Sequence, residues 1–342
     1  HKISHLFMTN VRVYLTGLGL IVLGYFCKAQ DFHSSINEAN KILLNPAFTG
    51  CYNGLHRIGM QFRNQWYQVP VSYKTLMVGA ETKIIPFLGK AHRLGIGLCI
   101  VQDKAGDIGY STSSVLLSAS YHHIFGKDST IGLSWGCSFG IHQTRFNTSD
   151  MTFDLQFDGF GYNPALSGGE NFSANRGTYP DWSTGLLLRK RFELQQWVLG
   201  FSAAHVNSPK IIFEQVRLGR RYVISIQDQI RYNSDWSLLP SLQIQFQGIN
   251  REWVPGFTGI LHNRSGKNSY IGLGLAYRTK DACVLAARYG TNSFIAAFAY
   301  DLNISPFKKA SRLQGAFEWQ LVYCIPEKII PIPKKIACPV GY

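Results

Sequence analysis

Residues 131–141 alternate strictly between large apolar and small side chains. The odd-numbered positions hold Ile, Leu, Trp, Cys, Phe and Ile, and the even-numbered positions hold only Gly and Ser. A period of two indicates a β-strand, because successive side chains point to opposite faces. A soluble sandwich would carry charged residues on its second face, whereas a bare face suits the inside of a closed barrel whose apolar face meets lipid. The pattern recurs in residues 94–100 and 271–277, so the sequence predicts an all-β, transmembrane antiparallel β-barrel.

The composition agrees with a wall that faces lipid on one side. Charged residues make up 16% of the 342 residues, against roughly 25% in average soluble proteins. The mean hydropathy is only −0.03, as expected where alternate residues meet lipid. The formal net charge of +14 would also fit a nucleic-acid partner. However, the chain has no basic helix and no Lys/Arg block, and the charges favour a surface near anionic lipid headgroups, with no nucleic acid bound.

The chain divides into four predicted parts. Residues 1–29 are expected to be a secretory signal peptide, with Lys2 and Arg12 beside an apolar run too short to span a membrane with confidence. Residues 30–54 are expected to form an N-terminal periplasmic or plug-like segment. Residues 55–325 form the barrel, and residues 326–342 form a short Pro-rich periplasmic tail, because its prolines forbid a central strand. Secretion without a later apolar helix indicates the outer membrane.

The alternating stretches predict about fourteen strands. Their expected ranges are 55–66, 72–83, 92–102, 111–122, 129–141, 181–191, 196–205, 220–232, 236–247, 252–262, 268–278, 282–290, 293–302 and 315–325. In outer-membrane barrels the extracellular loops are longer than the periplasmic turns. Here the long connections, such as residues 142–180 and 206–219, all follow odd-numbered strands. This parity supports an even count with both termini in the periplasm.

Several motifs resemble the PorP/SprF family of type IX secretion system outer-membrane proteins. They are the mature start, residues 30–32 followed by Asn-Pro-Ala-Phe-Thr-Gly at 45–50, the first strand at 57–66, and residues 103–112 after a Gly-rich strand. The ending with Cys338-Pro339 is also similar. The resemblance implies an outer-membrane barrel without enzymatic activity that assists type IX secretion. Some members serve the secretion or surface attachment of large adhesins, including adhesins for gliding motility.

Seven positions match the family motifs and are the predicted site residues: Asn45, Pro46, Gly50, Arg63, Trp66, Asp103 and Gly106. Structural roles remain open for them. Pro46 would fix a turn, Trp66 would anchor the membrane interface, and Arg63 would line the lumen.

The favoured function is binding of a secreted client protein at the extracellular loops, chiefly residues 142–180. The N-terminal segment and the tail are then expected to contact periplasmic components of the secretion system. The alternative is a porin or channel for small solutes, since many inward glycines leave room for water. A third interpretation, an outer-membrane esterase, lacks a G-x-S-x-G nucleophile motif, so no catalytic residue is predicted.

No cofactor or metal site is predicted either. His122 and His123 are expected in a solvated turn at a periplasmic strand end. Asp150, Asp154 and Asp158 lack the glycine and closing Glu of an EF-hand, but a loose calcium site in the large loop stays open as an alternative. A disulfide between Cys51 and Cys338 also stays open, because a sequence does not determine connectivity.

Overall fold

The computed structural model describes residues 31, 33–69, 72–84, 91–106, 109–126, 130–147, 151–169, 175–211, 216–263 and 269–326. The expected signal peptide, Asp150 and nearly all of the tail, including Cys338, lie outside the described residues. No described helix has the length and apolar character needed to cross a membrane.

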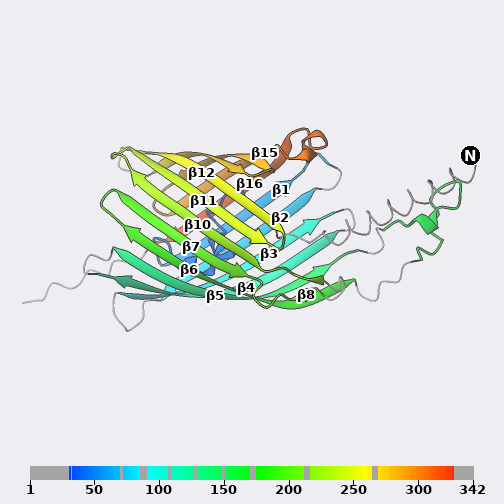
Figure 1. The fold of residues 1–342 in the computed structure, drawn as a ribbon, viewed down its shortest axis with the longest axis horizontal. Coiled ribbons are helices and arrows are strands. Elements are labelled where there is room, and N and C mark those ends of the chain that lie inside the picture. The colour runs from blue at the N-terminus through cyan, green and yellow to red at the C-terminus, as the bar shows by residue number, and fades with distance from the viewer. Residues whose placement is uncertain are drawn as a thin grey trace, which may run out of the picture.

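Fourteen antiparallel strands close into one barrel (Figure 1), as predicted. They are β1 (His56–Gln65), β2 (Tyr73–Ile84), β3 (His92–Ala105), β4 (Tyr110–Phe125), β5 (Ile131–Arg145), β6 (Arg176–Arg191), β7 (Gln195–Ala204), β10 (Arg221–Arg231), β11 (Trp236–Gln247), β12 (Asn250–His262), β13 (Tyr270–Arg278), β14 (Ala282–Gly290), β15 (Phe294–Asn303) and β16 (Gln314–Ile325). The first and last strands pair with each other, which leaves no open sheet edge.

The start of β6 shows the largest difference from the prediction, residue 176 instead of 181. The sequence prediction places Pro180 at the end of the long connection, and proline cannot donate a ladder hydrogen bond. In the structure Pro180 pairs with Ile141 of β5. On the other side β7 pairs only from Thr184 onward. Pro180 therefore occupies a local edge, where a missing donor is tolerated.

The two faces of the wall differ as the alternation predicts. On β5, Trp135 is 54% exposed on the outside, whereas Ser134 is 1% exposed and faces inward. Leu133 of the same strand and Leu117 of the neighbouring strand β4 also point outward. This arrangement suits lipid outside and a polar lumen.

The connections have unequal lengths at the two ends of the barrel. The connections that follow β5, β7 and β15 are long and lie at one end, here called the long-loop end. The second of them holds a small ribbon of β8 (Lys210–Ile211) and β9 (Val216–Arg217), and the third holds η4 (Pro306–Lys309). The short connections after β6, β10 and β14 lie at the opposite, short-turn end. By the usual rule for these barrels, the long-loop end is extracellular and the short-turn end is periplasmic.

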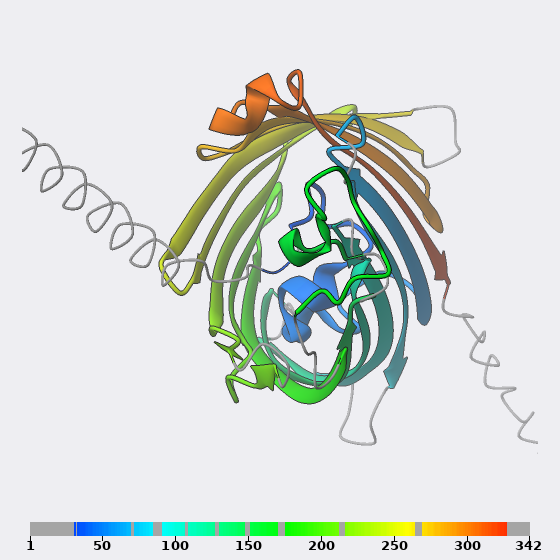
Figure 2. The same ribbon diagram turned by 90° about the vertical axis from the view of Figure 1, so that its right-hand side faces the viewer.

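The described part of the N-terminal segment lies inside the barrel (Figure 2). It contains the short helix α2 (Lys41–Leu44) and the 3-10 turn η1 (Pro46–Phe48). Asp31 contacts His205 and Arg221 at the long-loop end. Gly54 lies against Ile325 at the short-turn end. The segment therefore runs through the lumen from one mouth to the other.

Candidate functional site

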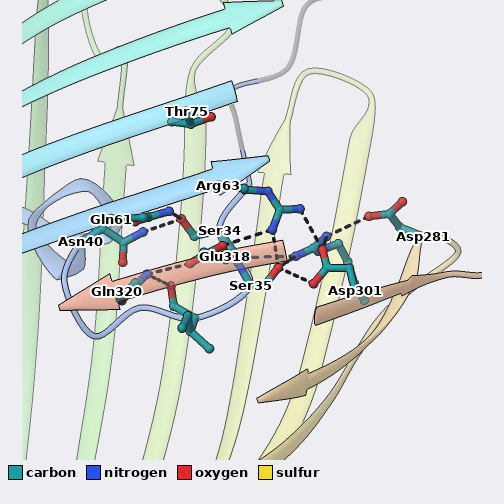
Figure 3. A network of polar contacts seen from close by, with 12 residues as sticks. Ser34, Ser35, Asn40, Gln61, Arg63, Thr75, Asp281, Asp301, Glu318 and Gln320 are labelled. Carbon is teal, nitrogen blue, oxygen red and sulfur yellow. Dashed lines mark hydrogen bonds and ion pairs between the residues drawn. The ribbon is translucent and has the colours of Figure 1, made fainter. Parts of the chain in front are cut away.

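The candidate site is the lumen, where the N-terminal segment meets the inward side chains of the wall. Its densest part is a charged cluster toward the long-loop end (Figure 3). The guanidinium of Arg63 on β1 donates to Asp301 of β15 at 2.8 Å and to Glu318 of β16 at 3.1 Å. These three side chains are at most 2% exposed. A charge so far from water is stable only if it is paired and hydrogen-bonded.

Ser35 ties the N-terminal segment into this cluster. Its backbone N–H donates to Glu318 at 2.8 Å, and its hydroxyl donates to Asp301 at 2.6 Å. Arg278 of β13 adds a second cation, at 3.2 Å from Asp301 and 3.0 Å from Asp281. Four strands and the segment therefore share one network, and removal of Arg63 would leave the buried carboxylate of Glu318 without a cation.

Gln320 of β16 pairs with the backbone of the segment as a neighbouring strand would. Its side-chain carbonyl accepts from the N–H of Ala39 at 2.7 Å, and its amide donates to the carbonyl of Ile36 at 2.7 Å. The segment is not a strand, so these buried backbone groups depend on side-chain partners. Inward polar residues on the wall supply them.

Asn45 fixes the next part of the segment. Its side-chain oxygen caps η1 by accepting from Ala47, and its amide donates to the carbonyls of Leu186 and Phe201 on β6 and β7 at 3.0 and 3.2 Å. Pro46 occupies the first position of η1, where its fixed φ suits the turn and a missing N–H costs nothing. The family-motif positions 45 and 46 therefore hold the segment against the wall.

The bare inner face of the wall exists because the segment fills the space. A Cβ at Gly136 would lie 2.5 Å from the backbone of Pro46 and Ala47, and one at Gly95 would lie 2.3 Å from the carbonyl oxygen of Thr49. Real Cβ atoms do not approach backbone so closely. The inward glycines on these strands accommodate polypeptide, so the roomy lumen expected for the porin alternative is wrong at this level of the barrel.

His122 is buried, which corrects the expectation of a solvated turn. It is 3% exposed and faces inward from β4. Its ring contacts the carbonyl oxygen of Thr49 at 2.8 Å and the hydroxyl of Ser134 at 2.7 Å. Because successive strand residues face opposite ways, His122 enters the lumen while its neighbour His123 lies on the other face, against the ring of His92.

Glu81 of β2 holds the end of the segment. Its carboxylate accepts from the backbone N–H of Gly50 at 2.8 Å and pairs with Arg57 of β1. Arg57 also donates to the carbonyl of Glu38. Gly50 itself has φ of 72°, a conformation that favours glycine, and this explains the glycine at that motif position.

At the long-loop end His205, just after β7, lies between two carboxylates. Its two ring nitrogens are each 2.8 Å from an oxygen, one of Asp31 and one of Asp181. Burial disfavours the charged imidazole, but Asp31 and the two hydrogen bonds outweigh it and raise the pKa of His205 to about 9. Burial likewise opposes ionisation of Asp31, yet His205 and Arg221 hold the pKa of that carboxyl below its usual range.

The structure brings together only some of the predicted site residues. Asn45, Pro46, Gly50 and Arg63 all lie in the lumen. The remaining three, Trp66, Asp103 and Gly106, lie near the long-loop end of β1 and β3.

These three have local roles. The ring of Trp66 packs on Tyr73 and Phe307. Asp103 accepts from the hydroxyl of Thr75 at 2.6 Å. Gly106 has φ of 82° in the turn before β4.

Sequence reasoning missed Ser35, Arg278, Asp301, Glu318 and Gln320. The last four occupy inward positions of otherwise apolar alternating strands. The sequence signal for these four lumen residues was a charged or amide side chain on the otherwise bare face of a strand.

The part of the chain that the structure describes contains no group of three His, Cys, Asp or Glu side chains that could hold a metal ion. Of the three aspartates in the large loop, Asp158 accepts from the backbone N–H groups of Phe160 and Gly161 at 3.0 Å. Its carboxylate therefore stabilises a turn. Cys51 forms no disulfide with any described residue.

Comparison with solved structures supports the barrel. A FadL homologue from Pseudomonas aeruginosa is 11% identical with a TM-score of 0.50, over 84% of this chain and 94% of that one. A mutant of the TodX monoaromatic hydrocarbon channel is 10% identical with a TM-score of 0.50, over 85% and 94% of the two chains. At such identity the likeness shows the fold alone. No curated protein matches the sequence significantly.

The family comparison covers most of the chain. The model for the type IX secretion system membrane protein PorP/SprF matches residues 27–323. Together with the closed barrel and its lipid-compatible outer face, this match places the protein in the outer membrane. The chain belongs to the PorP/SprF family of type IX secretion system membrane proteins.

Proposed function

We propose that this barrel, without catalysing a reaction, assists the secretion or surface attachment of a large, adhesin-like secreted protein that binds at its long-loop end. The observation that supports this proposal is a group of exposed apolar side chains in the connection between β5 and β6. Phe160 is 100% exposed, Leu155 is 67% exposed and Phe157 is 61% exposed. Large apolar groups in water commonly mark a binding surface.

The loop presents these side chains on ordered turns. Phe157 and Tyr162 form an isolated β-bridge, and the Asp158 carboxylate closes the turn between them. Figure 1 shows this green part of the chain extending beyond the barrel at the long-loop end. A preorganised apolar turn loses little conformational entropy on binding a partner, which suits it to hold a client protein.

The alternative, a channel for small solutes, draws on the shared fold with the solved TodX hydrocarbon channel. The segment through the lumen argues against it, because hydrogen bonds join it to β1, β6, β7, β15 and β16. In planar bilayers we expect wild-type protein to pass little current, and a deletion of residues 33–50 to pass more. Robust open-pore current from the wild type would favour the channel.

The client proposal is tested by affinity purification from native membranes in mild detergent, followed by mass spectrometry. We expect one large secreted protein to copurify with the wild type and to be lost with the Phe157→Ser/Phe160→Ser variant. The matched control is Leu194→Ser/Tyr232→Ser, which removes two exposed apolar side chains at the short-turn end and should retain the client.

Binding of the purified client to the purified barrel then excludes an indirect association. If both variants retain the client equally, the apolar turn does not bind it.

A further inference from the structure

The short-turn end of the lumen is hollow and rich in cations. A cavity of about 790 Å³ lies beside the N-terminal segment, and an adjoining one of about 1050 Å³ is lined by turns at that mouth, including residues 291–294. We call these two cavities the vestibule. The barrel is therefore filled by polypeptide toward the long-loop end and open toward the periplasm.

Five cations line the vestibule and form no salt bridge with any described residue: Lys41, Arg93, Arg189, Arg191 and Arg231. Three carboxylates also line the vestibule, and Asp228 among them accepts from the amide of Gln195. The other two are paired with cations outside this set of five. Glu81 is paired with Arg57, and Glu38 with Arg288 at 2.8 Å. The vestibule thus has an excess of positive charge within low-dielectric walls, which concentrate the field and attract anions.

One arginine of the vestibule has a hydrogen-bond donor that no described residue accepts. The Nε atom of Arg189 is buried and has no hydrogen-bond partner among the described residues. A buried donor without a partner costs free energy that an arriving acceptor would recover. Arginine also supplies a planar fork that binds carboxylates through two parallel hydrogen bonds.

The five cations are too far apart for one small anion to contact them all. Arg93 lies on β3 and Arg189 on β6, three strands along the wall, or roughly 14 Å. Arg231 lies on β10, two strands further along. An extended peptide covers roughly 14 Å in about four residues, so carboxylates spaced along such a peptide can reach successive cations.

We propose that the vestibule binds an acidic, extended polypeptide segment of another protein, which enters from the periplasm. This chain's own residues 326–342 are an unsuitable occupant, because they carry Lys328, Lys334 and Lys335 against one acidic residue, Glu327. The inference concerns the opposite mouth from the client surface, and it stands whether or not a client binds there.

The test uses the full-length barrel in detergent micelles and a fluorescent peptide of alternating Glu and Ser, with binding followed by anisotropy. We expect the acidic peptide to bind and a Lys/Ser peptide of the same length not to bind. Binding should weaken as NaCl rises from about 50 to about 300 mM, because salt screens exposed charges. Inorganic phosphate at the same total charge should displace the peptide poorly, since one phosphate cannot reach the separated cations.

The Arg93→Gln/Arg191→Gln variant should bind the peptide about fivefold more weakly, and Arg231→Gln alone about twofold more weakly. All three side chains are exposed in the vestibule mouth, so folding, checked by heat-dependent gel mobility, should not change. The control Lys74→Gln/Arg251→Gln removes two exposed charges at the long-loop end and should bind like the wild type. Equal loss in the control, unchanged binding in both vestibule variants, or full displacement by phosphate would overturn the proposal.

Discussion

Arg63 on β1 and Asp301 on β15 are 238 positions apart in the chain, yet their side chains meet at 2.8 Å in the lumen. The strand between them, β16, closes the barrel against β1. The ion pair therefore spans the seam where the two ends of the sheet join. Because Ser35 bonds to the same carboxylate, closure of the barrel and placement of the N-terminal segment depend on one another.

Replacement of Arg63 by Met should destabilise the barrel strongly. Asp301 and Glu318 would lose a shared cation in a place that water does not reach, and breaking a buried pair in this way costs about 3–5 kcal/mol. Unfolding by urea, followed by gel mobility, measures the loss. The exposed Lys74→Met should change the free energy of unfolding by only about 0.5 kcal/mol, and a similar small change for Arg63→Met would show that the cluster does not stabilise the seam.

Gly136→Ala should displace the N-terminal segment while leaving β5 intact. The new Cβ would lie 2.5 Å from the backbone of Pro46 and Ala47, so the segment must move. We expect roughly tenfold faster hydrogen exchange at the amides of residues 45 and 47–49, equivalent to about 1.4 kcal/mol. Gly132→Ala is the matched control on the same strand and face, because its Cβ meets only the flexible side chain of Arg189, at 3.4 Å. Equal exchange in both variants would contradict the close packing of the segment.

The contact between His205 and Asp31 should weaken at alkaline pH. The pKa of His205 is raised from 6.5 to about 9, so its stabilising charge is fully present below pH 6.5 and is lost as the pH rises through about 9. The barrel should lose roughly 3 kcal/mol of stability across that window. Unfolding measured from pH 6 to 10 tests this, with His205→Gln as the comparison. A wild-type curve parallel to that of the variant would show that the charge of His205 does not contribute.

A charge on the outer wall should be costly in the middle of a strand and tolerated at its end. Leu117 is 57% exposed on β4, opposite Phe139, and Leu117→Arg should cost about 2–4 kcal/mol in a bilayer. Phe125 ends the same strand at the short-turn side, where Phe125→Arg should cost about 0–1 kcal/mol. Folding into lipid vesicles measures both, and equal costs would contradict a membrane band around the middle of the wall.

The positions of the strands along the chain were predictable, because each strand depends on a local pattern of side chains. In residues 131–141 each large apolar side chain is followed by a small one, and this determines both the strand and its two faces. Trp135 and Ser134 point as the pattern requires. Closure followed from the same feature, since a wall with lipid outside cannot leave an unpaired edge.

The lumen was not predictable in the same way. The sequence identified Asn45 and Arg63 as motif positions, but the carbonyl groups that Asn45 contacts belong to β6 and β7. A carbonyl group of the main chain is present at every residue, so no side-chain pattern reveals which one is used. The burial of His122 also depended on a partner, Thr49, that lies 73 positions away.

By itself the sequence therefore determined a barrel of about fourteen strands with an apolar outer face. The reason is that the two-residue alternation assigns the side chains of each strand to its two faces. Only the tertiary structure decided that the bare inner face packs against the N-terminal segment and that Arg63 and Asp301 join the seam. It also decided that the periplasmic mouth holds cations that form no salt bridge with a described residue. Those features arise when closure of the sheet brings distant residues within a few ångströms of one another.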